Sequence, residues 1–281
     1  AYLLTKVLKR RNVKIIFDLD DALFLPVGSL FGIKVRPGSF YLEKILKDAD
    51  YVTVDSHYLL YYVKPFNRKA DILHVPVDIM LFNPNIKKKD VNNKITIGWQ
   101  GDPRAHYENL KMLIKPLEKI AKKYDIKFKI VSYLGDLRVK QMFKKLETLA
   151  EVDYGSERWL PLMEFARLMS DFDIAVAPLH KTLWNEGKSA LRVGTVMAMG
   201  IPVVASPVGE QKYIVKHGVN GFLVHNEVEW VKYLSLLIED DGLRRIMGKQ
   251  GRITAERELS IYACGRKLFS IIREVLVCDE T

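Results

Sequence analysis

Cysteine and long hydrophobic runs are scarce in this sequence. Two cysteines occur among 281 residues, Cys264 and Cys278. They are too few for a disulfide framework, and neither has the companion ligands of a metal site. This scarcity favours a reducing compartment, so we expect a cytoplasmic protein. No apolar run approaches the ~18 residues that span a bilayer, and no stretch has the pattern of a signal peptide.

The composition is that of a globular protein. Hydrophobic residues make up 48% of the chain and charged residues 28%, which is enough for a full core and an ordinary surface. The length predicts two domains. The chain begins at Ala1, without Met and inside an apolar helical pattern, so we expect it to be a piece of a longer polypeptide.

The net charge of +10 indicates an anionic partner of some kind. A basic surface suits phosphate-bearing ligands, an anionic membrane or nucleic acid. Many lysines, however, lie along one expected helix at 107–123, where a solvated face accounts for them. We therefore expect a phosphate-bearing small molecule and no nucleic acid.

The stretch 185–206, NEGKSALRVGTVMAMGIPVVAS, predicts a phosphate-binding site. We expect a loop, then a helix that starts at Lys188 and stops at Gly200, and a buried strand at 203–205. The first turn of such a helix has free N–H groups and the positive end of its dipole, which suit a phosphate. Lys188 adds a charge there, and Ser189 adds a hydroxyl donor. A packed crossover between two strands would produce the same Gly and Pro pattern.

The same stretch resembles the donor-site signature of retaining glycosyltransferases of family 4, which have the GT-B fold. It is closest to the branch with the signature G-K-S-x-L-K-x-x-E, and Arg192 stands at the branch's Lys. In that family, two Glu eight positions apart contact the sugar and the ribose of a nucleotide-sugar. Gly187 and Thr195 occupy those two positions here. Glu186, one residue earlier, could replace the first Glu, and only the Thr195 hydroxyl remains for the second.

Other segments resemble the same family. These are the hinge-like VPVDIMLFNP, DIAVAPL at 173–179 and HGVNGFLV at 217–224, where Asn-Gly indicates a hairpin turn. The resemblance implies phosphate contacts at the turn that holds Gly101 and Arg104, and contacts to the base from Arg158 and Trp159. The G-x-x-G pattern at this turn is not a dinucleotide fingerprint.

Carboxylates follow the first expected strand, at 13–17. Asp18, Asp20 and Asp21 lie where open α/β sheets place their sites. In the glycosyltransferase interpretation Asp20 or Asp21 meets the acceptor; they could equally cap the next turn. FDLDDALF also resembles the first motif of haloacid-dehalogenase-type phosphatases, although Ala22 replaces the expected Thr or Val. That alternative stays open here.

The sequence thus predicts an α/β, GT-B-like protein with two Rossmann-like domains and parallel sheets. We expect a partial acceptor-side domain at 1–84, a nucleotide-sugar domain at 85–258 and a helix at 259–281 that packs back on the first. The resemblance implies transfer of a sugar from a nucleotide-sugar to an acceptor hydroxyl with retention. Glu186, Asp20 and Asp21 are the candidate catalytic residues. The candidate donor-binding residues are Gly101, Arg104, Arg158, Trp159, Gly187, Lys188, Ser189, Arg192 and Thr195.

We expect no metal and no other cofactor, and a glycan or lipid-linked acceptor. The apolar and basic loop at 28–38 could grip a lipid-linked acceptor or an anionic membrane surface, so we also consider a peripheral location. A non-catalytic GT-B-fold subunit is the first alternative, because Thr195 replaces a Glu of the donor motif.

Overall fold

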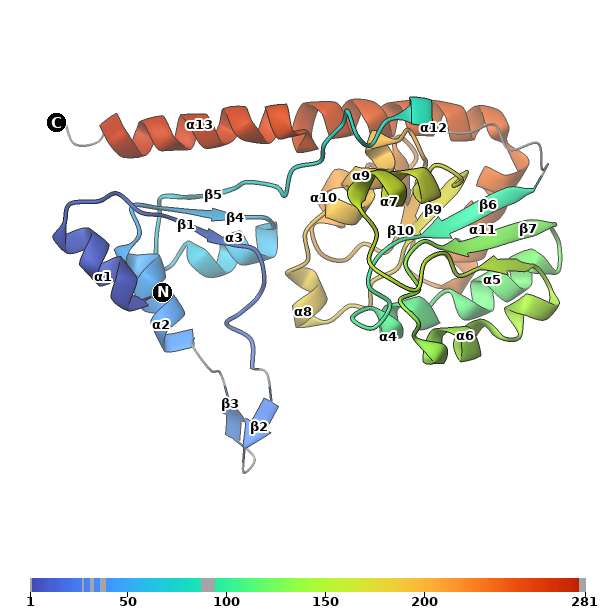
Figure 1. The fold of residues 1–281 in the computed structure, drawn as a ribbon, viewed down its shortest axis with the longest axis horizontal. Coiled ribbons are helices and arrows are strands. Elements are labelled where there is room, and N and C mark those ends of the chain that lie inside the picture. Colours follow the sequence, from blue (N-terminus) through green and yellow to red (C-terminus); the bar gives the residue numbers. More distant parts are fainter. Residues whose placement is uncertain (1, 27, 31–32, 36–38, 87–93, 278–281) are drawn as a thin grey trace.

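The computed structural model describes residues 2–26, 28–30, 33–35, 39–86 and 94–277. It is an α/β structure with a three-stranded and a six-stranded parallel sheet, and the two lie side by side along the long axis (Figure 1). The strand orders are β1-β4-β5 and β11-β10-β9-β6-β7-β8. The fold class is therefore as predicted.

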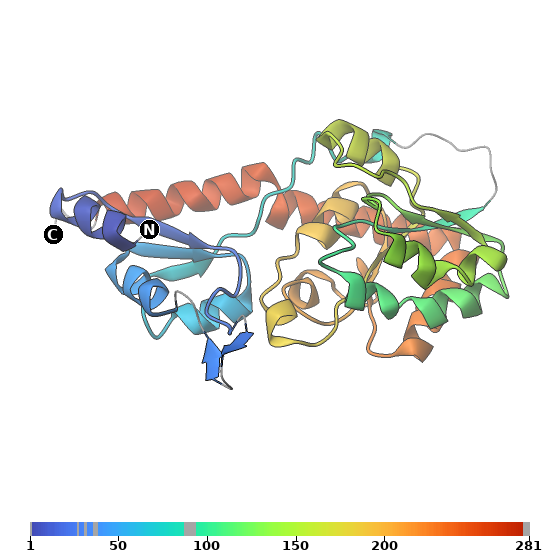
Figure 2. The same cartoon turned by 60° about the horizontal axis from the view of Figure 1, so that its bottom comes forward.

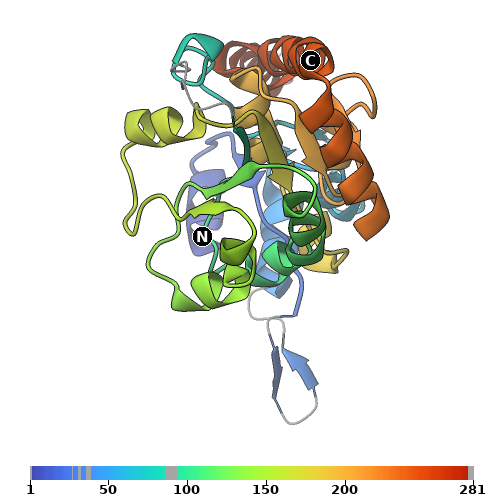
Figure 3. The same ribbon diagram turned by 90° about the vertical axis from the view of Figure 1, so that its right-hand side faces the viewer.

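The first sheet is built by residues 2–72. Its elements are α1 (Tyr2–Arg10), β1 (Ile16–Leu19), β2 (Gly28–Leu30), β3 (Ile33–Val35), α2 (Ser39–Asp48), β4 (Tyr51–Val54), α3 (His57–Val63) and β5 (Ala70–Ile72). β1 and β5 pair with either side of β4, with Ile16 opposite Tyr51 and Ala70 opposite Val52. The side chain of Ser56 caps α3 by accepting from the Leu59 N–H. β2 and β3 form an antiparallel hairpin that projects away from both sheets (Figure 3). Residues 31–32 and 36–38 of the loop that we expected to face a membrane or a lipid-linked acceptor lie outside the described residues.

The second sheet is built by residues 95–223. In chain order its elements are β6 (Ile95–Trp99), α4 (Tyr107–Lys111), α5 (Ile114–Ala121), β7 (Ile126–Ile130), α6 (Leu137–Phe143), β8 (Glu151–Asp153), α7 (Leu162–Met169), β9 (Ile174–Ala177), α8 (Leu183–Glu186), α9 (Leu191–Ala198), β10 (Val203–Ala205), α10 (Gln211–Ile214) and β11 (Gly221–Leu223). Helices α11 (Glu227–Glu239), α12 (Asp241–Thr254) and α13 (Ile261–Val277) follow, with a π-helical turn at Ala255–Leu259 before α13. Short 3₁₀ turns lie at Pro84–Ile86 and Leu146–Thr148.

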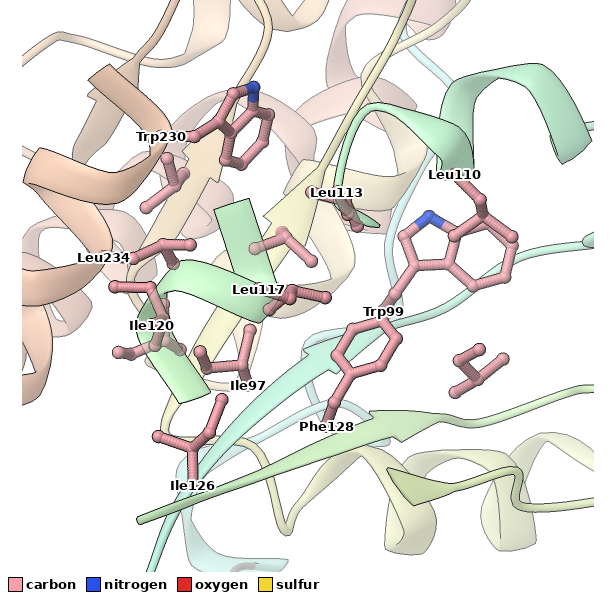
Figure 4. Close-up of a cluster of buried hydrophobic side chains, with 14 of the residues drawn as sticks. Ile97, Trp99, Leu110, Leu113, Leu117, Ile120, Ile126, Phe128, Trp230 and Leu234 are labelled. Carbon is pink, nitrogen blue, oxygen red and sulfur yellow. The ribbon is translucent and has the colours of Figure 1, made fainter. Parts of the chain in front are cut away.

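The main core lies between the six-stranded sheet and helices α4, α5 and α11. Trp99 and Phe128 rise from neighbouring strands towards Leu110 and Leu117, while Trp230 on α11 closes the far side (Figure 4). A second cluster of buried side chains covers the other face of the sheet, under α7 and α9. Both faces are thus covered, as the continuous apolar strands require.

Helix α13 joins the two halves of the molecule. It runs from the six-stranded half across to the three-stranded sheet (Figures 1 and 2). There Ile271 and Val275 pack against Tyr51 and Ile16. The segment after β5 crosses in the opposite direction, and Val77 exchanges backbone hydrogen bonds with Leu259 and Ile261 on the way. Two chain crossings therefore set the relative position of the sheets.

Several element bounds differ from the prediction. The expected helix at 107–123 is broken into α4 and α5, because Pro116 has no N–H to donate to the carbonyl of residue 112. β11 pairs in parallel with β10, so the Asn-Gly turn does not form a β-hairpin. The Asn220 side chain instead accepts from the Lys216 N–H and donates to the Ile214 carbonyl. The first strand covers 16–19, which places Asp18 inside it.

Candidate functional site

The site lies where the carboxyl ends of the two parallel sheets meet. Ser56, directly after β4, donates a hydrogen bond from Oγ to the Gly187 carbonyl at 3.3 Å. Asp21, after β1, forms an ion pair with Lys188, whose Nζ is 3.0 Å from Oδ1. Strand ends from both halves thus converge on residues 187–188.

The loop from Trp184 to Lys188 is held by close packing. A Cβ added to Gly187 would lie 3.0 Å from Cβ of Ala22, which follows β1. Gly209, at φ +67°, lies so near the loop that a Cβ there would stand 2.7 Å from the Asn185 carbonyl oxygen and 2.9 Å from that of Lys188. Only glycine fits this position, because it needs both the left-handed backbone and the missing side chain.

Glu210 ties this loop to the first half of the molecule. Its N–H donates to the Lys188 carbonyl at 2.9 Å. Its buried carboxylate accepts from the His57 N–H at 2.9 Å and faces Nδ1 of the same histidine at 3.0 Å. The His57 ring stacks on Tyr213, with ring centroids 3.9 Å apart.

Two cations are positioned at this junction. Nζ of Lys188 lies 4.8 Å from the centroid of the Trp184 ring, in addition to its pair with Asp21. Arg192, in the first turn of α9, forms no ion pair with the described residues, and loss of hydration lowers its pKa to about 10. A Cβ on Gly101 would lie 3.6 Å from Nη1 of Arg192, so the turn after β6 borders this guanidinium closely.

A neutral histidine supports Arg192. Nη2 of Arg192 lies 2.5 Å from Nε2 of His106 and 3.1 Å from Nδ1, and Nδ1 is 2.8 Å from Nδ2 of Asn109. Burial and the neighbouring Arg192 and Lys188 lower the pKa of His106 to about 3, so it carries no charge at neutral pH. The acceptor nitrogen of this neutral ring can orient the guanidinium without neutralising its charge.

Asn109 connects this histidine to the loop 180–188. Its Oδ1 accepts from the His180 N–H at 2.8 Å and from Nδ2 of Asn185 at 3.1 Å. The Asn185 amide also donates to the His180 carbonyl at 2.9 Å. The loops after β6 and β9 are therefore held together by a buried amide network.

The structure brings some predicted residues together and leaves others apart. Gly101, Gly187, Lys188 and Arg192 are linked by the contacts above. Arg104 forms a two-pronged pair with Asp102 in its own turn, with Nε–Oδ1 and Nη2–Oδ2 distances of 2.9 and 2.8 Å.

The residues predicted to contact the base lie on the loop after β8. Trp159 is exposed, and Nη2 of Arg158 is 3.6 Å from the Glu164 carboxylate. Because β8 is an edge strand, this loop lies at the same end of the sheet as Lys188 but at its side.

The start of α9 differs from the prediction. The helix begins at Leu191 with Ala190 as its cap residue, and residues 185 and 186, expected to lie in a loop, belong to the short helix α8. Lys188 and Ser189 therefore lie in the non-helical segment between two helices. Gly200 ends α9 at φ +68°, as predicted.

Glu186 and Thr195, the two residues that could replace the family's Glu pair, are both engaged within the protein. The Glu186 carboxylate accepts from Nζ of Lys212 at 2.7 Å. Thr195 is 4% exposed, and its hydroxyl donates to the Leu191 carbonyl at 2.7 Å, one turn earlier in α9.

Acidic residues occupy the opposite wall of the junction. Asp20 is exposed, whereas Asp55 is only 5% exposed. Burial raises the pKa of Asp55 to about 8, helped by the nearby Asp20, Asp21 and Asp18. Among the described residues, no group of three or more His, Cys, Asp or Glu is arranged to hold a metal ion. No helix in that part of the chain is long and apolar enough to cross a membrane.

Sequence reasoning did not identify Asn109, Asp55 or Glu210 as site residues. Each acts through partners far away along the chain, such as His57 for Glu210 and His180 for Asn109. One local signal was available, because Asp55 directly follows the apolar strand Tyr51–Val54, where α/β sheets place functional groups.

The fold and the facing strand ends define a GT-B structure. A glycosyltransferase from Rickettsia africae superposes with a TM-score of 0.70 and 15% identity, over 98% of this chain and 80% of that one. Sucrose-phosphate synthase from Thermosynechococcus elongatus gives 0.73 and 15%, over 99% and 72%. Anabaena HepE, solved in complex with UDP and glucose, gives 0.69 and 15%, over 96% and 74%.

The chain belongs to the family of glycosyl transferases group 1, whose model matches residues 94–240. A curated relative, the D-inositol 3-phosphate glycosyltransferase of Xylanimonas cellulosilytica, is 31% identical over 121 residues. That match covers 41% of this chain and only 28% of the relative. The GT-B superposition, which covers 98% of this chain, argues against the phosphatase interpretation of FDLDD.

Proposed function

We propose that the chain binds a nucleoside diphosphate sugar at Lys188 and Arg192 and transfers the sugar, with retention, to an acceptor hydroxyl held on the acidic side. The observation that carries this proposal is Arg192, a partly buried guanidinium that is bordered by Gly101 and His106 and forms no ion pair with the described residues. Partial burial without an anionic partner is costly for a cation, and a bound diphosphate would compensate it.

The chemistry follows from the charges. As the bond to the sugar breaks, negative charge develops on the departing diphosphate, and fixed cations stabilise it most in a water-poor site. We propose that Lys188 and Arg192 do this without a divalent metal. Transfer activity that survives excess EDTA supports this view; activity that requires added Mg²⁺ contradicts it.

The further assignments are proposals on the same footing. Trp159 would stack on the base and Arg158 would hydrogen-bond it, because their loop lies at the same end of the sheet as Lys188. Glu186 would contact the sugar once freed from Lys212. Solved relatives contain UDP and glucose, so UDP is the first donor nucleotide to test.

A thermal-shift panel of UDP, GDP and ADP tests the proposal and selects the base. We expect one of them to raise the melting temperature, and Lys188→Ala to weaken its binding by about 1.5–3 kcal/mol, the range for a hydrogen bond to a charged group. Arg138→Ala is the control, because Arg138 is an exposed cation that is already paired with Asp136 in its own turn.

The second candidate is a non-catalytic subunit with the same fold, and Thr195 favours it. The Thr195 hydroxyl is uncharged, so it cannot replace the charged acceptor that a Glu would offer the ribose. It already donates its proton to the Leu191 carbonyl. This candidate predicts that a folded protein binds none of the three nucleotides at millimolar concentration. Binding of any of them, sensitive to Lys188→Ala, excludes it.

A further inference from the structure

A cavity of about 490 Å³ lies beside the donor site, at the carboxyl ends of the three-stranded sheet. Asp18, Asp20 and Asp55 line one side, and α13 closes the other with Ile261 and Leu268. This volume is within the range of sites for small molecules. The cavity therefore has an acidic wall and an apolar wall.

The acidic wall has no basic counterpart. None of the residues that line the cavity, all in the described part of the chain, is Lys or Arg. Of the nearest lysines, Lys188 pairs with Asp21 and Lys267 with Asp71. His74 also lines the cavity, and burial lowers its pKa, so it adds no charge at neutral pH.

Asp55 has a buried oxygen without a partner. Its Oδ1 makes no hydrogen bond with any described residue, although the side chain is only 5% exposed. Oδ1 of Asp18, in contrast, accepts from the Thr53 hydroxyl at 2.5 Å. A buried polar atom normally has a hydrogen-bond partner, so we infer that a ligand supplies the partner of this Asp55 oxygen.

We propose that this cavity binds an ammonium-bearing ligand, with the ammonium on Asp55 and Asp20 and the carbon skeleton against α13. An ammonium brings both donors and a positive charge to the acidic wall, whereas a phosphate would meet like charges and a hydroxyl would supply only a donor. Near neutral pH Asp55 holds a proton in the empty cavity. It releases this proton when the ammonium binds, because a neighbouring cation lowers the pKa of a carboxyl group. That this ligand is the sugar acceptor rests on the proposed function: Asp20 of the cavity wall is next in sequence to Asp21, which pairs with Lys188. The acceptor would then be an amino sugar or amino alcohol.

Three sugars that differ at one carbon test the charge: 6-amino-6-deoxyglucose, glucose and glucose 6-phosphate, titrated calorimetrically at pH 8, where Asp55, with a pKa of about 8, is largely free to ionise. We expect the amine to bind about tenfold or more tighter than glucose, as one charged hydrogen bond implies, and the phosphate to bind most weakly. Asp55→Asn should remove most of the preference for the amine. Asp125→Asn, an exposed acid paired with Lys94, is the control and should keep it.

Equal binding of amine and glucose, a preference for the phosphate, or an amine preference that survives both Asp55→Asn and Asp20→Asn overturns the inference. Absence of binding by all three sugars also overturns it. If a nucleoside diphosphate still binds in that case, the proposed function stands and only the inference fails. Amine binding without any nucleotide binding would instead uphold the cavity and refute the proposed function.

Discussion

At the scale of single residues, Asp21 and a bound diphosphate compete for Lys188. Both partners of the ion pair are partly exposed, so it contributes only about 0.2–1 kcal/mol. Asp21→Asn should therefore tighten nucleotide binding by roughly two- to fivefold, because the competing carboxylate is lost. Calorimetry with the nucleotide selected by the panel measures this change. A weaker affinity would show instead that Asp21 holds Lys188 in its binding position.

Asp55 makes stability depend on pH. Its folded-state pKa is about 8, whereas an unfolded Asp has a pKa of about 3.9. Between these values the folded state holds a proton that the unfolded chain releases, so stability falls as the pH rises. A one-proton difference amounts to about 2 kcal/mol of unfolding free energy between pH 6 and pH 8.

Asp55→Asn should remove this pH dependence. Urea unfolding at pH 6, 7 and 8 should show a flatter profile for the variant than for the unchanged protein, with the gain concentrated at pH 8. Asp125→Asn, the exposed control, should keep the original slope. Parallel profiles for all three proteins would mean that Asp55 titrates at an ordinary pKa.

At the scale of elements, the loop before α9 depends on Gly209. Gly209→Ala forces a side chain onto the Asn185 and Lys188 carbonyls and should cost about 1–3 kcal/mol of stability. Because the loop must shift, nucleotide binding should weaken as well.

Gly218 supplies a matched control for that change. Its φ is +78°, close to that of Gly209, yet an added Cβ would meet no atom within 4 Å. Gly218→Ala should therefore cost about 1 kcal/mol through the backbone alone and leave nucleotide affinity unchanged. If Gly209→Ala and Gly218→Ala change nucleotide affinity equally, the position of the loop before α9 does not determine nucleotide binding.

The elements also show how far the sequence could predict the fold. The strand at 203–205 has the predicted bounds, because a short apolar run between polar or Gly/Pro positions has little freedom to shift. The start of α9 was wrong by three residues, since nothing local distinguishes Lys188 from Leu191 as a first helical residue. The segment before α9 is held by contacts of Asn185 and Lys188 with Gly209 and Glu210, which lie on another loop.

The residues of the candidate site could also be predicted only in part from the sequence. Lys188 and Arg192 follow from one continuous motif, whereas Glu210, Asn109 and Asp55 gain their roles only from neighbours brought close by the fold. Arg104 illustrates the reverse case, because its own turn supplies Asp102 as a competing partner. The spacing of residues alone cannot reveal such a pair.

At the scale of the whole molecule, the two sheets are held by α13, by the crossing at Val77 and by Glu210. The donor loop contacts both halves, since Lys188 binds Asp21 of one half and Glu210 of the other. Donor binding and the position of the acidic cavity are therefore connected through the same few residues. A nucleotide that displaces Asp21 from Lys188 would change the charge of the cavity wall next to it.

The central claim is that Arg192, and not Arg104, binds the donor diphosphate. Calorimetric titration of Arg192→Ala, Arg104→Ala and the control Arg138→Ala with the selected nucleoside diphosphate tests it directly. We expect Arg192→Ala to lose about 1.5–3 kcal/mol, or roughly ten- to a hundredfold in affinity, while the other two variants stay near the unchanged protein. A loss confined to Arg104→Ala, with Arg192→Ala folded and binding normally, would contradict the account.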